Sequence, residues 1–343
     1  MSASSSHRPQ WLDRRLAWVA NLFGARKSPI DSDLPDPSPT TIFEPHATHG
    51  AGQPPHLGRF IVEREIGRGA MGVLVQARDP RTEQPVAIKT MALGHEFQGD
   101  ALEEARSRFY REAELAGRLH HPDIVSILEA GEDNGLAYIA MEFLEGEDLS
   151  THVQESTLLP VPDVLAITAR VADALAYAHA QGVTHRDVKP ANILIDAGTD
   201  SVKVTDFGIA RIVDSTQTRT GMVLGTPSFM SPEQMAGDRV DGRSDLYSLG
   251  VTLYQLLTAQ LPYRGDSMAQ LIRAITSDPV PDIRALRPEL PQELADIVSL
   301  ALEKRPEVRY ANGRELSADL RTVLRAMNDA GHVNAGHNSQ ASP

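Results

Sequence analysis

The chain has 343 residues, of which 41% are apolar and 23% charged, enough to bury the core of an enzyme-sized globular protein. Its formal charge of −13 argues against generic binding to nucleic acid, because phosphate contacts need an excess of lysine and arginine on one face. It contains no cysteine, which excludes disulfides, thiolate metal sites and a cysteine nucleophile. No stretch approaches the roughly 20 consecutive apolar residues of a transmembrane helix, and we expect a cytoplasmic protein.

Residues 1–27 form a basic segment with an amphipathic pattern. Apolar residues recur at helical spacing between positions 11 and 23, and basic residues accompany them. The apolar set is Trp11, Leu12, Leu16, Trp18, Val19, Leu22 and Phe23, and the basic set is Arg14, Arg15, Arg26 and Lys27. Two interpretations stay open: a helix over residues 11–27 that makes peripheral contact with a membrane surface or a partner, and a helix that packs on the folded body or frays.

Two further segments have the composition of disordered chain. Residues 28–55 are rich in Pro, Ser, Thr, Asp and Gly and cannot bury enough apolar surface to offset chain entropy, so we interpret them as a linker. Residues 328–343 are rich in Gly, Asn, Ser and His and predict a disordered tail. The folded domain is therefore expected over residues 57–327.

Within that domain, strand patterns come first and helical patterns follow. Residues 60–62, 73–75 and 86–88 predict three antiparallel strands, and a helix is expected over 101–119. Residues 124–127 and 137–143 would complete a small sheet. Helices are expected over 164–180, 246–257, 267–276, 291–302 and 314–325. This order predicts an α+β protein with a small β-rich lobe, about 57–143, and a larger α-helical lobe, about 147–327.

Glycines at Gly67, Gly69 and Gly72 lie between the first two predicted strands. Without a Cβ, their backbone can approach phosphate oxygens closely. A dinucleotide-binding fold would need such a run to open a helix, whereas this run leads into a strand, so we exclude a dinucleotide-dependent oxidoreductase. Lys89 follows Gly72 by seventeen positions at the end of the next strand, which favours a loop that covers phosphates.

The run from His185 to Asn192, followed fourteen positions later by Asp206-Phe207-Gly208, carries the strongest chemical signal. Phosphoryl transfer needs a carboxylate for the incoming hydroxyl, a cation over the transferring charge, and oxygen ligands that hold Mg²⁺ against the nucleotide phosphates. Asp187, Lys189 and the pair Asn192 and Asp206 supply these groups in order. The set predicts a phosphoryl-transfer centre.

Together with Val86-Ala87-Ile88-Lys89 and Ser231-Pro232-Glu233, these motifs resemble the protein kinase superfamily, and specifically the bacterial members of the eukaryotic-type serine/threonine kinases. The resemblance spans roughly residues 57–327 and implies a bilobal protein kinase-like fold, with one main helix in the β-rich N-lobe. Two departures occur, since Leu74 replaces the usual valine and Phe229 stands where tyrosine is common. Neither removes a chemical group.

The resemblance implies a role for each matching residue. Asp187 would accept and orient the substrate hydroxyl, Lys189 would neutralise charge on the γ-phosphoryl, and Asn192 and Asp206 would bind Mg²⁺. Lys89 would bind the α- and β-phosphates of ATP and pair with a helix glutamate. We choose Glu112 for that glutamate, against its neighbours Glu103, Glu104 and Glu114.

Further matches concern adenine and the support of the site. Leu74, Ala87 and Leu194 would enclose adenine, and Met141 would be the gatekeeper that precedes the hinge, residues 142–144. Backbone groups of Glu142 and Leu144 would bond the adenine edge. The resemblance also implies that Asp245 anchors the backbone of the loop around Asp187, and that Glu233 and Arg309 form a buried ion pair.

The sequence thus predicts an ATP- and Mg²⁺-dependent serine/threonine kinase acting on protein substrates. Arg186 can pair with a phosphate, so we expect activation by autophosphorylation in trans of Thr218 and Thr220, through self-association of two copies. The alternative is a catalytically weak, nucleotide-binding pseudokinase scaffold. Such members typically lose the lysine or one of the two aspartates, and this chain keeps Lys89, Asp187 and Asp206.

Overall fold

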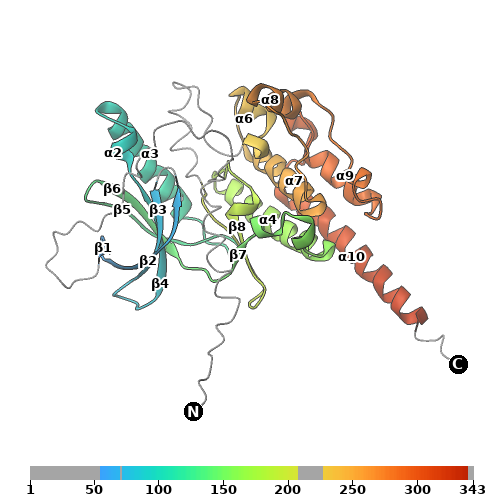
Figure 1. The fold of residues 1–343 in the computed structure, drawn as a ribbon, viewed down its shortest axis with the longest axis horizontal. Helices are drawn as coiled ribbons and strands as arrows, with labels where there is room; N and C mark the ends of the chain where they lie inside the picture. The colour runs from blue at the N-terminus through green and yellow to red at the C-terminus, as the bar shows by residue number, and fades with distance from the viewer. Residues whose placement is uncertain (1–54, 70–71, 208–226, 339–343) are drawn as a thin grey trace, which may run out of the picture. The chain divides into compact units, whose positions relative to one another are not determined.

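The structure is a computed structural model that describes residues 55–69, 72–207 and 227–338. The chain divides into two compact units. The first holds the residues up to Arg118 together with Ser126–Glu147, and the second holds Leu119–Val125 together with Asp148–Pro343. Figure 1 shows the first unit as mainly strands and the second as mainly helices, which confirms the predicted α+β class.

A six-stranded antiparallel sheet forms the first unit. The strands are β1 His56–Leu57, β2 Phe60–Gly69, β3 Gly72–Arg78, β4 Pro85–Met91, β5 Ile127–Asp133 and β6 Leu136–Glu142. Their order in the sheet is β1-β2-β3-β4-β6-β5. Buried Val and Ile side chains recur in the inner strands, including Val62, Val75, Ile88 and Ile139, as β-branched residues fit a pleated, buried surface. The predicted antiparallel arrangement of residues 60–62, 73–75 and 86–88 is confirmed.

The register separates the two faces of this sheet. One face carries a buried apolar cluster that includes Phe60, Val75 and Ile88. On the other face, Leu74 lies opposite Lys89 and Ala87 lies opposite Met141. Because side chains alternate along a strand, these four residues share one face.

Gly72, the first residue of β3, has no room for a side chain. A Cβ there would lie 1.8 Å from the carbonyl oxygen of Thr90 on β4. The Thr90 hydroxyl also holds this point, since it accepts from the N–H of Val73 at 2.9 Å and donates to the carbonyl of Val73 at 3.0 Å. The glycine is therefore required by packing between β3 and β4, independently of any phosphate.

We expect Gly72→Ala to destabilise the fold by about 1–3 kcal/mol, because the added methyl must push β3 away from β4. The matched control is Gly117→Ala at the end of a helix, where nothing lies within 4 Å of the new methyl. Urea unfolding of both variants measures the difference. A Gly72→Ala protein as stable as the Gly117→Ala protein would contradict this packing argument.

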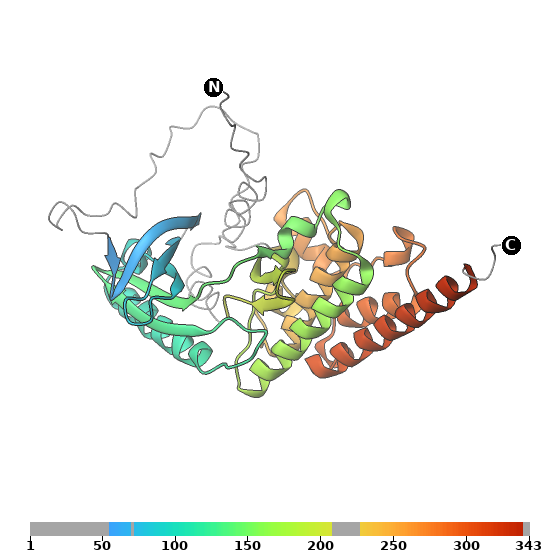
Figure 2. The same ribbon diagram turned by 90° about the horizontal axis from the view of Figure 1, so that it is seen from below.

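Helix α3, Asp100–Gly117, is the main helix of the first unit, and the short α2, Leu93–Glu96, precedes it. Figure 2 shows α3 beside the sheet, and its contacts there are with β5. Its inward side chains include Phe109, Ala113 and Glu112. The helix predicted over residues 101–119 is therefore confirmed to within two residues.

The described part of the second unit contains six α-helices, several short 3-10 helices and a small sheet, of which only Glu147 belongs to the first unit. The helices are α4 Val161–Ala180, α6 Pro232–Ala236, α7 Gly242–Thr258, α8 Met268–Ser277, α9 Gln292–Ala301 and α10 Gly313–Asn338. The strands β7 Glu147–Asp148, β8 Ile193–Asp196 and β9 Ser201–Val204 lie in the order β7-β8-β9. Helix α7 is buried along most of its length and packs on α4 and α9. No helix in residues 55–69, 72–207 and 227–338 combines the length and apolar character needed to cross a membrane.

Residues 124–127 correct one prediction. They were expected to form a strand of the first sheet, yet β5 begins only at Ile127. Instead, Ile124 forms an isolated parallel bridge with Val204, and the N–H of Val125 donates to the carbonyl of Val204 at 3.0 Å. These bonds assign residues 119–125 to the second unit rather than to the predicted N-lobe. An apolar run alone does not identify its hydrogen-bonding partner.

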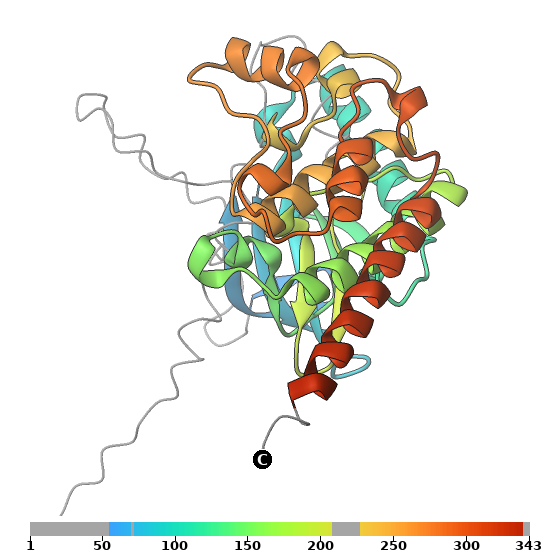
Figure 3. The ribbon, with the colours of Figure 1, turned by 90° about the vertical axis from the view of Figure 1, so that its right-hand side faces the viewer.

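Helix α10 corrects a second prediction. A helix was expected only over residues 314–325, with a disordered tail from 328, but α10 continues to Asn338. Figure 3 shows its C-terminal turns, in red, extending beyond the neighbouring helices. Its N-terminal half packs on α4, and adding residues to an existing helix costs far less than starting one. Composition alone therefore placed the end of this helix too early.

Candidate active site

Asp187, Lys189 and Asn192 meet in one cluster in the second unit. The ammonium of Lys189 donates to Oδ2 of Asp187 at 2.7 Å, and Nδ2 of Asn192 donates to the same oxygen at 3.0 Å. Nδ2 of Asn192 also donates to the backbone carbonyl of Asp187 at 2.7 Å. Oδ2 is thus held by two donors, and the carboxylate, 31% exposed, keeps a route to an incoming hydroxyl.

Asn192 presents an unsatisfied oxygen. The residue is 1% exposed, and its Oδ1 is buried without a hydrogen-bond partner among the described residues. The amide cannot be turned round, because both acceptors beside Nδ2 are oxygens. A buried acceptor left unpaired costs about 1–3 kcal/mol. An amide oxygen held in this way is a suitable ligand for a hard cation such as Mg²⁺.

Asp206 follows strand β9 and has a left-handed backbone, with φ of 64°. Aspartate tolerates this conformation better than most residues, and such angles are concentrated at functional sites. The N–H of Thr205 donates to the carbonyl of Asn192 at 3.0 Å, which ties the two predicted metal ligands together through the backbone. Phe207 is buried, and its ring centroid lies 4.6 Å from that of His185.

His185 holds the loop rather than exchanging protons. It is fully buried; Nε2 donates to the carbonyl of Thr205 at 2.7 Å, and Nδ1 accepts from the N–H of Asp187 at 3.2 Å. One nitrogen is a donor and the other an acceptor, so the ring is neutral in this arrangement. His185 thereby connects the segments that carry Asp187 and Asp206.

Asp245, on α7, anchors the backbone of the loop that carries Asp187. Its carboxylate accepts from the N–H of His185 at 2.8 Å, the N–H of Arg186 at 2.7 Å and Nε2 of His179 at 2.7 Å. Burial opposes ionisation of Asp245. The hydrogen bond and attraction from His179, together with the backbone N–H of His185, outweigh this effect and lower the pKa of Asp245. The implied anchoring role of Asp245 is confirmed by these bonds.

A bidentate ion pair lies beside this anchor. The guanidinium of Arg309 meets Glu233 at 2.6 and 2.7 Å, and the hydroxyl of Ser244 donates to Glu233 at 2.5 Å. The Arg309 side chain is 0% exposed. Burial opposes the charge on Glu233, yet the bonds from Arg309 and Ser244 prevail and lower the pKa of Glu233. The predicted ion pair is confirmed.

These two carboxylates predict a pH dependence of stability. Their pKa values lie below the ordinary 3.8 and 4.5, so both stabilise the fold above about pH 4.5 and lose that contribution as the pH falls through their folded-state pKa values. We expect the free energy of unfolding in urea to fall below pH 4.5, with a shallower slope in Asp245→Asn. Asp200→Asn, at a fully exposed side chain, should leave the slope unchanged. Equal slopes in both variants would contradict this assignment.

The first unit collects the predicted nucleotide residues on one face of its sheet. Leu74, Ala87 and Met141 are buried there, and Lys89 lies beside them, half-buried. Glu112 is the buried glutamate of α3, at 7% exposure. Its three rivals have exposed side chains that pair with arginines of their own helix: Glu103 with Arg106, Glu104 with Arg108, and Glu114 with Arg118. Burial therefore favours Glu112 as the partner of Lys89, which stays a prediction.

The remaining predicted residues are placed as follows. Gly67 and Gly69 lie at the end of β2, and Gly69 pairs with Gly72 across the turn. Glu142 ends β6, where its N–H donates to the carbonyl of Ser126 at 3.0 Å. Leu144 is half-buried just after β6, in the first unit, whereas Leu194 is buried on β8, in the second. Gly208, Thr218, Thr220 and residues 1–54 lie outside the described residues.

The structure adds three residues that the sequence analysis missed. His179 donates to Asp245, Gln234 donates through Nε2 to the carbonyl of Arg186 at 3.0 Å, and Thr90 holds the start of β3. A histidine near the end of a helix has no signal of its own that names a partner 66 residues away. For Gln234, the capping pattern of Ser231 with Gln234 was readable, since both halves of that capping box are present.

Comparison with known proteins identifies the fold that carries this site. The family model described as "Protein kinase domain" matches residues 60–319. Serine/threonine-protein kinase pkn3 of Myxococcus xanthus is 39% identical over 300 residues, covering 83% of this chain and 54% of that protein. Serine/threonine-protein kinase PknB of Mycobacterium leprae is 41% identical over 277 residues, covering 78% of this chain and 43% of that protein. The chain thus spans about half the length of the curated relatives that it matches.

The solved structures agree. The crystal structure of the PknI kinase domain of Mycobacterium tuberculosis matches with a TM-score of 0.64 and 31% identity, covering 80% of this chain and all of that domain. Since the matched residues include the Asp187 cluster, Asp206, Asp245 and the buried ion pair of Glu233 and Arg309, the chain belongs to the protein kinase family.

Proposed function

We propose that the chain transfers the γ-phosphoryl group of Mg-ATP to serine and threonine hydroxyls of protein substrates. The observation that carries the proposal is the cluster of Asp187, Lys189 and Asn192, with the unsatisfied Oδ1 of Asn192. The names of the relatives, which are serine/threonine-protein kinases, support the choice of substrate hydroxyl. Because ATP is available in the cytoplasm, we infer that the domain acts there.

The donor set fits Mg²⁺. Asn192 offers a buried amide oxygen without a partner among the described residues, and Asp206 offers a carboxylate tied to Asn192 by the backbone of Thr205. Asn192 and Asp206 would hold Mg²⁺, which would supply positive charge beside the nucleotide phosphates. Amide and carboxylate oxygens are the ligands that this cation prefers, with waters and phosphate filling its other positions.

Asp187 would orient the substrate hydroxyl and take up its proton. As the new bond forms between the substrate oxygen and γ-phosphorus, the bond from γ-phosphorus to the oxygen of ADP breaks, and the hydroxyl proton passes to the carboxylate of Asp187. Lys189 donates to Oδ2 at 2.7 Å and so orients that carboxylate, and its positive charge would offset negative charge on the transferred phosphoryl group. Asn192 holds Oδ2 from the other side and fixes the carboxylate plane.

The N-lobe would hold the nucleotide. Lys89 would bind the α- and β-phosphates, positioned by Glu112, and Leu74, Ala87 and Met141 would cover adenine with Leu194. Since the N–H of Glu142 is already bonded to Ser126, the carbonyl of Glu142 is the group we assign to the adenine amino group. The N–H of Leu144 would then meet the next position on the adenine edge.

The experiment is phosphoryl transfer from γ-labelled ATP to a generic protein such as casein, with Mg²⁺ and the full chain. We expect label on serine and threonine after hydrolysis of the product, and none without Mg²⁺. If the chain binds Mg-ATP but transfers no label to casein or to itself, the proposal is wrong and a nucleotide-binding scaffold takes its place.

We further propose activation by autophosphorylation in trans at Thr218 and Thr220. The support is Arg186, which precedes Asp187 and has a left-handed backbone, φ 69°, fixed by the bond from its N–H to Asp245. A phosphate paired with this guanidinium would couple the segment after Asp206 to the Asp187 loop.

Phosphosite mapping tests this activation. We expect phosphate on Thr218 and Thr220 in the active chain and none after expression of Asp187→Asn. The activity per enzyme molecule should increase faster at higher enzyme concentration, because one copy modifies another. Active enzyme that is unmodified at both threonines would contradict the activation proposal, while leaving transfer to substrates in place.

A further inference from the structure

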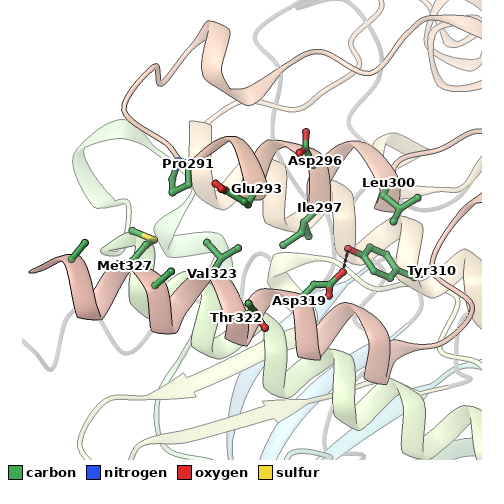
Figure 4. Close-up of a pocket in the computed structure, with 12 residues that line it drawn as sticks. Pro291, Glu293, Asp296, Ile297, Leu300, Tyr310, Asp319, Thr322, Val323 and Met327 are labelled. Carbon is green, nitrogen blue, oxygen red and sulfur yellow. Dashed lines mark hydrogen bonds between the residues drawn. The ribbon is translucent and has the colours of Figure 1, made fainter.

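A largely apolar groove runs between α9 and α10. It has a volume of about 640 Å³, and Figure 4 shows the side chains that line it. Apolar side chains from both helices line it: Ile297, Leu300, Val323, Ala326, Met327 and Ala330. Leu300 is 36% exposed. This face belongs to the second unit alone and uses no residue of the active site.

The edge of the groove is acidic. Glu293 and Asp296 stand on α9 and Asp319 on α10, and no lysine, arginine or histidine is among the lining residues. Asp319 accepts from the hydroxyl of Tyr310 at 2.9 Å, as Figure 4 shows, and Asp296 accepts from Nε2 of Gln292 at 2.9 Å. These bonds leave the negative charges in place. The groove therefore suits an apolar helix with basic flanks and disfavours an acidic one.

The chain contains a segment with that chemistry. In helical geometry, Leu12, Leu16, Val19 and Phe23 fall within about 60° of one another, because successive residues turn by about 100°. On the same wheel, Arg15, Arg26 and Lys27 flank the apolar stripe, within about 80° of its centre. The stripe matches the groove in polarity, and its flanks match the acidic edge in charge.

The connection is long enough for docking within one molecule. Residues 28–54 separate this segment from the described fold, and fully extended they reach roughly 90 Å. As a flexible chain their root-mean-square span is roughly 29 Å. A lobe of about 200 residues has a radius of gyration of roughly 16 Å, so the span is comparable with the width of the lobe. Tethering at this length gives an effective concentration in the millimolar range.

We propose that residues 11–27 dock as a helix into the groove between α9 and α10 of the same molecule. The apolar stripe enters the groove, and the basic flanks meet Glu293, Asp296 and Asp319. Docking would occur on the surface of the second unit and does not depend on phosphoryl transfer.

Tryptophan fluorescence of the full chain tests the docking, because both tryptophans of the protein, Trp11 and Trp18, lie in this segment. On the same wheel the two tryptophans lie roughly 110° and 130° from the centre of the stripe, so docking restricts their motion rather than burying them. We expect slowly decaying fluorescence anisotropy in the wild type and faster local decay in Glu293→Lys/Asp296→Lys. The matched control is Glu289→Lys/Glu307→Lys, which reverses two exposed charges that are not among the lining residues. Equal anisotropy decay in both double variants would overturn the proposal.

Disulfide trapping identifies the occupant, because the natural chain has no cysteine. Val19→Cys/Thr322→Cys places one thiol in the stripe and one in the groove, and Val19→Cys/Ala318→Cys uses an exposed position on α10 outside the groove. We expect an intrachain disulfide to form at least about tenfold faster in the first variant, at a rate independent of protein concentration. A disulfide-linked dimer, or tryptophan anisotropy that decays slowly only after anionic phosphatidylserine vesicles are added, would overturn docking within one molecule.

Discussion

Asp187→Asn should reduce kcat for phosphoryl transfer by about 10²–10⁴-fold, the usual contribution of a positioned general base. Asparagine keeps the size and one acceptor of aspartate but cannot take the hydroxyl proton. It also removes the charge that Lys189 meets at 2.7 Å. Since ATP binding is assigned to other residues, KM for ATP should change little. Initial rates with γ-labelled ATP over a range of ATP concentrations separate the two constants.

The matched control is Asp200→Asn, the same substitution at a fully exposed side chain of the same lobe. Asp200 also has a left-handed backbone, φ 51°, which asparagine adopts equally well. We expect this variant to keep the kcat of the wild type. If Asp187→Asn retained more than about a tenth of that kcat, Asp187 would not be the proton acceptor.

Arg309→Leu should lower the free energy of unfolding by about 3–5 kcal/mol, because it leaves the charge of Glu233 buried without its partner. It also removes donors to the carbonyls of Glu303 at 2.6 Å and Lys304 at 3.0 Å. Urea unfolding at neutral pH measures the loss. At pH values below the ordinary pKa of Glu233, the difference from the wild type should shrink, because the lone carboxyl can then protonate.

Two further variants make this test specific. Arg118→Leu breaks an exposed pair with Glu114, whose side chains are 68% and 66% exposed, and should cost about 1 kcal/mol or less. Glu233→Leu/Arg309→Leu removes both buried charges and should regain part of the loss seen in Arg309→Leu. A loss in Arg309→Leu as small as that in Arg118→Leu would contradict the structural role of the ion pair.

Local patterns were sufficient to predict most of the elements. Alternating β-branched residues located β2, β3 and β4, and periodic apolar residues located α3, α4 and α7. Motif spacing was sufficient for the cluster of Asp187, Lys189 and Asn192, because residues two and five positions apart in one loop cannot lie far from each other.

Contacts between residues far apart in the sequence could not be predicted, because a local pattern does not identify the residue that it contacts. The residues 124–126 were predicted as sheet because their apolar run is the same whether it pairs with β6 or with Val204. His179 meets Asp245 only because α4 packs on α7, which no local pattern encodes. The clash that requires Gly72 involves a carbonyl on the next strand. The start of α10 is likewise fixed by packing against α4, and its continuation to Asn338 adds turns to a helix already formed, which its own glycines and asparagines do not reveal.

The central claim is that Lys89, from one unit, and Asn192 and Asp206, from the other, hold the same Mg-ATP. A double-mutant cycle tests it most directly, using Lys89→Met, Asp206→Asn and the combined variant, with binding of a non-hydrolysable ATP analogue measured by calorimetry in Mg²⁺. Residues that share one ligand should show a coupling energy of at least about 1 kcal/mol. Losses that add to within about 0.5 kcal/mol would show that the two side chains act on separate sites and would contradict the claim.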